Sequence, residues 1–210
     1  MTTIVHLVRH GEVDNPDRVL YGRMPGYHLS DAGRTMADKA AAFLSGRDLV
    51  HLVSSPLERA LETAVPIAEL TGLAIDQDER LIEAANSFEG HQVAGGQGKK
   101  LLHPRYWPRY WNPLRPSWGE PYEHIAARVM AAVEDARQAA EDHEAVCVTH
   151  QLPIVVATRR GRGERLWHDP RRRHCALGSV TSLVFAGTKI VQVDYAEPAG
   201  ETPRGAVAGA

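Results

Sequence analysis

A largely apolar run near the start of the chain, residues 4–8, ends abruptly in Arg9-His10-Gly11-Glu12. A short run rich in valine, leucine and isoleucine is typical of a buried strand in an α/β sheet. Arg9 and His10 would then lie at the carboxyl end of that strand, the edge where open α/β sheets bind ligands. A guanidinium, an imidazole and a glycine at such an edge indicate an anion site that contains a nucleophile or a base.

The size and charge of the chain limit what it can be. It has 210 residues, of which 43% are hydrophobic and 24% charged, an ordinary balance for a soluble globular protein. We expect a single α/β domain over residues 1–196 and a loosely ordered tail over 197–210. The formal net charge of −2 gives no general attraction to nucleic acid or membranes, so any anion site must be local.

The start of the chain and its cysteines indicate the compartment. Met-Thr-Thr is followed by no signal-peptide pattern, and no apolar run approaches the ~20 residues of a membrane-spanning helix. We therefore expect a cytoplasmic protein with no membrane partner. Cys147 and Cys175 have no metal-ligand spacing, and Cys147 lies in an apolar run that predicts a small core residue.

Periodicity along the chain predicts alternating strands and helices, which is the pattern of an α/β fold. Helical patterns cover residues 30–45, 55–72 and 120–140, and a further helix begins within 154–158. Short apolar runs predict strands at 49–53, 73–75 and 145–148, and a closing β-hairpin at 177–185 and 189–195.

The start of the second predicted helix carries an unusual cation. Residues 55–58, Ser-Pro-Leu-Glu, have the residue types of a capping box with serine at the N-cap. Arg59 follows in the first turn, where its charge opposes the partial positive charge of the helix N-terminus. A bound anion would remove this conflict, because the helix dipole and Arg59 would both face it. The alternative is an ion pair of Arg59 with Glu58 or Glu62.

A second predicted strand also ends in a histidine. The run 145–148 is followed by Thr149 and His150, and a carboxylate is available at Glu83. If this strand lies beside the first one in a parallel sheet, His10 and His150 meet at the same edge.

Five motifs follow one another in a fixed order along the chain. They are Arg-His-Gly-Glu at 9–12, Gly-Arg with Leu-Ser-Asp-Ala-Gly within 22–33, Ser-Pro-Leu-Glu-Arg-Ala-Leu-Glu-Thr-Ala at 55–64, Arg-Leu-Ile-Glu at 80–83 with Glu-Gly at 89–90, and Val-Thr-His at 148–150. In these motifs the chain resembles the histidine phosphatase superfamily, the phosphoglycerate mutase-like proteins. The matches cover most of residues 4–90 and resume at 119–155.

The resemblance implies a three-layer α/β/α sandwich with a mostly parallel central sheet. It also implies a phosphatase that needs no metal or cofactor and acts on a small phosphate ester through a phosphohistidine. The implied roles are nucleophile for His10, proton donor for Glu83, catalysis and phosphate binding for His150, and phosphate binding for Arg9 and Arg59. Neighbouring arginines should keep the His10 ring neutral. Glu79 and Glu89 are the alternatives to Glu83.

Departures from the mutase pattern favour hydrolysis. Mutases of this superfamily carry serine or threonine where this chain has Val13, and asparagine where it has Pro16. Residues 84–87 also differ from the mutase continuation of the acid-donor motif. Mutase-type phosphoryl transfer remains the alternative, and a phosphate-binding module without turnover is a weaker one. Candidate substrate-binding residues are Asn15, Arg23 and Gln151.

Two stretches lie outside the motifs. Residues 91–119 lack periodicity, and their 99–118 tract interleaves lysine and arginine with tryptophan and tyrosine. Such a tract can stack on single-stranded nucleic acid, but the net charge favours a lid over the phosphate pocket and no nucleic-acid partner. Seven arginines between 159 and 173 are interpreted as helix-end and loop charges in water. The oligomeric state stays open.

Overall fold

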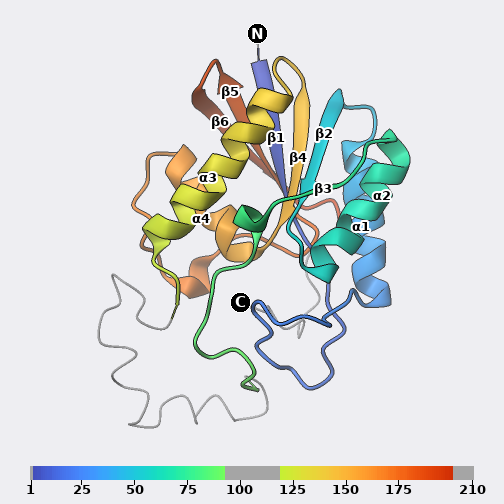
Figure 1. The fold of residues 1–210 in the computed structure, drawn as a ribbon, viewed down its shortest axis with the longest axis vertical. Coiled ribbons are helices and arrows are strands. Elements are labelled where there is room, and N and C mark those ends of the chain that lie inside the picture. Colours follow the sequence, from blue (N-terminus) through green and yellow to red (C-terminus); the bar gives the residue numbers. More distant parts are fainter. Residues whose placement is uncertain (1, 93–118, 201–210) are drawn as a thin grey trace.

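The computed structural model describes residues 2–92 and 119–200 (Figure 1). In these residues the strands are β1 (Thr2–Arg9), β2 (Leu49–Ser54), β3 (Asp76–Gln77), β4 (Glu144–Thr149), β5 (Val180–Ala186) and β6 (Lys189–Ala196). The helices are α1 (Asp31–Leu44), α2 (Glu58–Thr71), α3 (Tyr122–Ala139) and α4 (Gln151–Gly161), with 3₁₀ turns η1 (Glu79–Leu81) and η4 (Pro170–Arg172).

The six strands form one sheet in the order β3-β2-β4-β1-β5-β6. The pairs β3–β2, β2–β4 and β4–β1 are parallel, and the hairpin β5–β6 joins the edge of β1 antiparallel. The sheet is therefore mostly parallel, as expected. The register pairs Arg9 of β1 with Thr149 of β4, so both strands end at the same level.

Helices cover both faces of the sheet and make three layers (Figure 1). Helices α3 and α4 pack on one face, where Val5, Leu7 and Cys147 point into their apolar cluster. Helices α1 and α2 pack on the other face against Val8 and Val148. This arrangement confirms the predicted α/β/α sandwich, and Cys147 is the core residue that the sequence predicts.

Most predicted elements occur within a few residues of the predicted bounds. Ser30 caps α1 by accepting a hydrogen bond from the backbone N–H of Gly33 at 3.0 Å. The predicted strand at 73–75 is wrong, because those residues return from α2 along its apolar cluster and only Asp76–Gln77 pairs with β2. Helix α4 begins at Gln151, earlier than predicted, because Pro153 fits within a first helical turn.

The predicted 99–118 tract and most of the expected 197–210 tail lie outside the described residues. In the described part of the chain, no helix combines the length and the apolar character needed to cross a membrane.

Candidate active site

The carboxyl ends of β1 and β4 bring two histidines into contact. His10 follows β1 and His150 follows β4, and their ring centroids lie 5.1 Å apart at an interplanar angle of 58°. His10 is 2% exposed and His150 is fully buried. The two side chains therefore meet at the sheet edge, where the sequence places them.

The ring of His10 is held in one tautomer. Its Nδ1 lies 2.8 Å from the carbonyl oxygen of Gly11. Because a carbonyl oxygen only accepts, Nδ1 carries the proton and Nε2 keeps its lone pair. Burial, followed by the charges of Arg59 and Arg9, holds the pKa of His10 well below its usual value. The ring is therefore neutral near pH 7, with Nε2 available as a nucleophile.

The ring of His150 is hydrogen-bonded through the other nitrogen, Nε2. Its Nε2 lies 2.8 Å from the hydroxyl oxygen of Ser55. Among the described residues this hydroxyl has no other acceptor, so we assign it as the donor to Nε2 and place the ring proton on Nδ1. That Nδ1 is buried and has no hydrogen-bond partner within residues 2–92 and 119–200. Burial keeps the pKa of His150 well below its usual value, so the neutral ring presents one N–H donor to the site.

The contact of Ser55 with His150 overturns the predicted capping box. Helix α2 begins at Glu58, and its N-cap is Leu57, which makes no side-chain cap bond. The Ser55 hydroxyl is a weak partner of the Leu57 N–H, at 3.4 Å, because its short bond goes to His150. Glu58 accepts from the N–H of Gly26 instead of closing a capping box.

Arg9 and Arg59 are both buried, at 3% and 0% exposure. Arg9 donates to the carbonyl oxygen of Cys175 at 2.6 Å, and Arg59 donates to that of Gly22 at 2.6 Å. Neither arginine forms an ion pair with a described residue; the alternative of pairing Arg59 with Glu58 or Glu62 is therefore wrong. Three of their N–H-bearing atoms are buried without a partner in the described residues: Nε of Arg9, and Nε and one terminal nitrogen of Arg59.

Buried cations without a carboxylate partner are costly, and unpaired buried donors are rare in proteins. An anion between the two arginines and His150 would satisfy all three residues. The aromatic ring of Tyr21, with its centroid 4.8 Å from the Arg59 guanidinium carbon, supports that guanidinium from one side.

Glu83 is the buried carboxyl group of the site, at 3% exposure. Its Oε1 accepts the backbone N–H of Ala84 at 2.8 Å. Burial raises the pKa of Glu83 above its usual value, although Arg59 and Arg9 oppose the shift. The other two carboxyl candidates lie elsewhere: Glu79 is exposed, and Glu89 accepts the backbone N–H groups of Arg23 and Asn86.

The segment that carries Glu83 is held by hydrogen bonds to its four consecutive backbone carbonyl groups, those of residues 80–83. Arg128 of α3 donates to the carbonyl oxygens of residues 80 and 82 at 2.6 and 2.7 Å. Thr149 at the end of β4 donates to that of residue 81, and Arg23 donates to that of Glu83 at 2.6 Å. Arg23 and Arg128 also bind the carboxylate of Glu120. Three separate elements therefore fix the position of the Glu83 backbone.

Close backbone packing fixes the loop after His10. A Cβ on Gly11 would lie 2.3 Å from the carbonyl oxygen of Gly33, and one on Gly33 would lie 1.9 Å from that of Glu12. The Gly11 N–H donates to the hydroxyl of Thr63 on α2. The start of α1 and the face of α2 thus clamp the loop that carries the nucleophile candidate.

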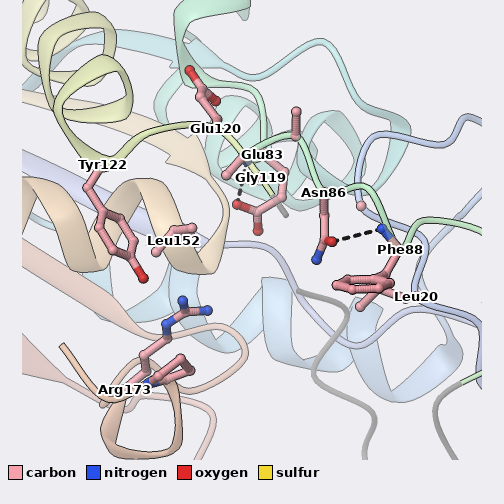
Figure 2. Close-up of a pocket in the computed structure, with 13 residues that line it drawn as sticks. Leu20, Glu83, Asn86, Phe88, Gly119, Glu120, Tyr122, Leu152 and Arg173 are labelled. Atoms are coloured by element: carbon pink, nitrogen blue, oxygen red, sulfur yellow. Dashed lines mark hydrogen bonds between the residues drawn. The ribbon is translucent and has the colours of Figure 1, made fainter. Parts of the chain in front are cut away.

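A cavity of about 250 Å³ opens beside Glu83, bounded by described residues (Figure 2). Its apolar wall comes from Leu20, Ala84, Phe88, Tyr122, Leu152 and Pro170. Its polar lining includes Glu83, Asn86, Glu120 and Arg173. In Figure 2 the carboxylate of Glu83 points into this space.

The three candidate substrate-binding residues take different places. Asn15 closes its own loop, because its amide bonds both backbone groups of Val19. Arg23 holds the backbone of Glu83, and Gln151 is the buried first residue of α4 beside His150.

Reasoning from sequence missed Tyr21, Ser55 and Arg128. The motifs could have indicated the first two, because Tyr21 directly precedes Gly22-Arg23 and Ser55 lies within the 55–64 motif. Arg128 could not be distinguished by sequence from the other charged residues of α3. In the described part of the chain, no group of three or more His, Cys, Asp or Glu side chains could hold a metal ion.

Fold and site together define a class of α/β sandwich in which two parallel strands end in neighbouring histidines beside buried arginines. The chain belongs to the histidine phosphatase superfamily (branch 1), whose profile matches residues 5–198. This finding confirms the resemblance inferred from the five motifs.

Individual relatives include both phosphatases and mutases. The chain is 53% identical over 197 residues to the uncharacterized protein Rv0525 of Mycobacterium tuberculosis, covering 94% of this chain and 97% of that protein. It is 30% identical over 156 residues to the 2,3-bisphosphoglycerate-dependent phosphoglycerate mutase of Thermoplasma acidophilum, covering 73% and 74%. The solved structure of a mycobacterial glucosyl-3-phosphoglycerate phosphatase matches with a TM-score of 0.73 at 25% identity, covering 93% of this chain and 97% of that one.

Proposed function

We propose that this protein hydrolyses the phosphate monoester of a small metabolite through a phosphohistidine on His10. One observation supports the proposal most: buried nitrogens of Arg9, Arg59 and His150, unpaired in the part of the chain that the structure describes, lie in the same site as a neutral His10 whose Nε2 keeps its lone pair. The proposal needs no metal and no nucleic-acid or membrane partner.

The arginines make attack on the ester possible. A phosphate monoester carries close to two negative charges at pH 7 and repels a nucleophile. Arg9, Arg59 and the Nδ1–H of His150 would bind its non-bridging oxygens and stabilise the charge in the transition state. These donors are held in place before the substrate arrives, so little reorganisation is needed.

In the first step Nε2 of His10 attacks phosphorus and the bond from phosphorus to the ester oxygen breaks. Glu83, whose pKa is raised by burial, would give its proton to the departing oxygen. The His10 ring gains positive charge as the new bond forms. The Gly11 carbonyl, which already accepts the Nδ1–H, stabilises that charge.

In the second step water attacks the phosphohistidine and the phosphorus–nitrogen bond breaks. The Glu83 carboxylate left by the first step would take the proton of the attacking water. His10 returns to its neutral form and inorganic phosphate leaves, so protons and bonds balance over the cycle.

A mutase would use the same first step but return the phosphoryl group to an alcohol. The 30% identity to a phosphoglycerate mutase keeps this alternative open. Val13 and Pro16 stand where mutases carry polar residues, which favours hydrolysis.

Incubating the wild-type protein and His10→Ala with 4-nitrophenyl phosphate tests the proposal. Wild type should release phosphate and carry acid-labile phosphate on His10 after rapid quenching, and the variant should do neither. Unchanged turnover by His10→Ala would refute the mechanism. Formation of 2-phosphoglycerate from 3-phosphoglycerate and 2,3-bisphosphoglycerate, without net phosphate release, would establish the mutase alternative.

A further inference from the structure

The cavity beside Glu83 contains a cation that the proposed chemistry does not use. Arg173 lines this cavity and is the last of the seven arginines between 159 and 173. At the end of α4, Arg159 pairs with Glu164 and Arg160 pairs with Glu123. Arg173 therefore differs from the solvated charges that the sequence predicts for this stretch.

A neutral histidine holds Arg173 in place. The Nε–H of Arg173 donates to Nε2 of His168 at 3.0 Å. His168 can accept this bond because its Nδ1–H donates to the carbonyl oxygen of Leu166, at 2.7 Å, and because burial lowers the pKa of its ring. The His168 ring in turn packs on Tyr122, with ring centroids 5.3 Å apart. The bond to His168 uses only Nε–H, and not the N–H groups of the two terminal nitrogens.

Figure 2 shows where these groups point. The guanidinium of Arg173 and the hydroxyl of Tyr122 lie on one side of the cavity, Phe88 and Leu20 on the other, and the Glu83 carboxylate between them. A substrate whose ester oxygen faces Glu83 would therefore extend toward the guanidinium, past apolar walls.

The two carboxyl groups that line the cavity, those of Glu83 and Glu120, do not cancel the charge of Arg173. Glu120 also lines the cavity, but its two oxygens receive three hydrogen bonds from Arg23 and Arg128. Glu83 enters the proposed cycle as a neutral acid. The corner at Arg173 consequently favours an anion.

The size of the cavity is sufficient for a small alcohol. A cavity of about 150 Å³ accepts benzene, and this one measures about 250 Å³. It has room for one ring, or a chain of similar bulk, together with one charged substituent.

We propose that Arg173 determines specificity by binding a carboxylate on the alcohol part of the substrate, while apolar residues around it hold a ring or short chain. The substrate class is thus a phosphate monoester of a hydroxy acid. This inference rests on the proposed hydrolysis at His10.

Two esters that differ only at that substituent test the proposal: 3-carboxyphenyl phosphate and 3-carbamoylphenyl phosphate. Arg173→Gln should lower kcat/KM for the carboxylate ester about ten- to a hundredfold more than for the carboxamide, mostly through KM. The matched control is Arg172→Gln, which removes the same charge at an exposed neighbouring position outside the cavity lining and should change neither ester.

Equal losses for both esters would overturn the proposal, because Arg173 would then act on Glu83 or on the phosphate. The absence of any loss would overturn it as well. Calorimetry with 3-hydroxybenzoate and 3-hydroxybenzamide in the presence of inorganic phosphate needs no turnover. Tighter binding of the benzoate, lost in Arg173→Gln, would support the pocket even if His10 were not phosphorylated, so failure of the inference and failure of the proposed hydrolysis are distinguishable.

Discussion

The hydroxyl oxygen of Ser55, which follows β2, lies 2.8 Å from Nε2 of His150, which follows β4. With the Ser55 hydroxyl assigned as the donor, the ring proton of His150 lies on Nδ1, which is buried and has no partner among the described residues. Ser55 thus acts on the chemistry through another residue, in the position where a helix cap was predicted.

Replacing Ser55 with alanine should therefore lower activity more than stability. The His150 ring would lose its only hydrogen bond among the described residues, and we expect kcat/KM for 4-nitrophenyl phosphate to fall about tenfold. Ser55→Thr keeps the hydroxyl and should recover most of the loss. A helix cap would behave differently: Ser55→Ala would lower the free energy of unfolding by about 1 kcal/mol and leave kcat/KM unchanged.

Replacing Glu83 with glutamine should separate substrates by their leaving groups. An alkyl phosphate needs a proton on the departing oxygen, so its kcat should fall about 10²–10³-fold, and that of 4-nitrophenyl phosphate much less. In wild type, hydrolysis of the alkyl ester should decline as pH rises through the raised pKa of Glu83, because the acid form is lost. The same alkaline decline with both esters would show that another group supplies the proton.

The same substitution should affect stability in a pH-dependent way. Because the pKa of Glu83 is higher in the folded state than in the unfolded chain, ionising it costs folding free energy. The cost is absent below the unfolded pKa of about 4.3 and grows as pH rises toward the folded pKa. Glu83→Gln should thus raise Tm at pH 7–8 and leave it unchanged near pH 4. A lower Tm at pH 8 would contradict this assignment.

Arg128 should matter for catalysis although it lies outside the phosphate site. Lysine in its place keeps the charge but cannot bind two carbonyl groups and Glu120 together. We expect Arg128→Lys to lower kcat for an alkyl phosphate about tenfold, a part of what a general acid contributes, with little change in KM. Arg137→Lys, on the same helix but paired with Glu134, is the control. Equal effects of both variants would indicate a general loss of stability.

Replacing Gly33 with alanine should disturb the loop that follows His10, although Gly33 itself lies on α1. The alanine Cβ would lie 1.9 Å from the Glu12 carbonyl oxygen, so the loop or the start of α1 must shift. We expect a loss of about 1–3 kcal/mol in the free energy of unfolding, together with reduced phosphorylation of His10. Ala32→Ser, at the exposed neighbouring position, should affect neither quantity. Full activity in Gly33→Ala would show that the clamp is dispensable.

The sequence by itself determined the strand ends and their catalytic candidates. Apolar runs reveal buried strands, and parallel strands end at one edge, so the pattern of residues alone places Arg9, His10 and His150 together. Arg59 stood out because a cation at a helix start needs an explanation.

Only the tertiary structure decided which side chains support these residues. Ser55 and His150 are 95 positions apart, and Arg128 reaches carbonyl groups 46 and 48 positions away. Periodicity reports local backbone conformation and burial, whereas the partner of a hydroxyl or a guanidinium depends on which distant segments the topology brings together. For the same reason Arg173 resembled its solvated neighbours until the fold placed it in the cavity beside Glu83.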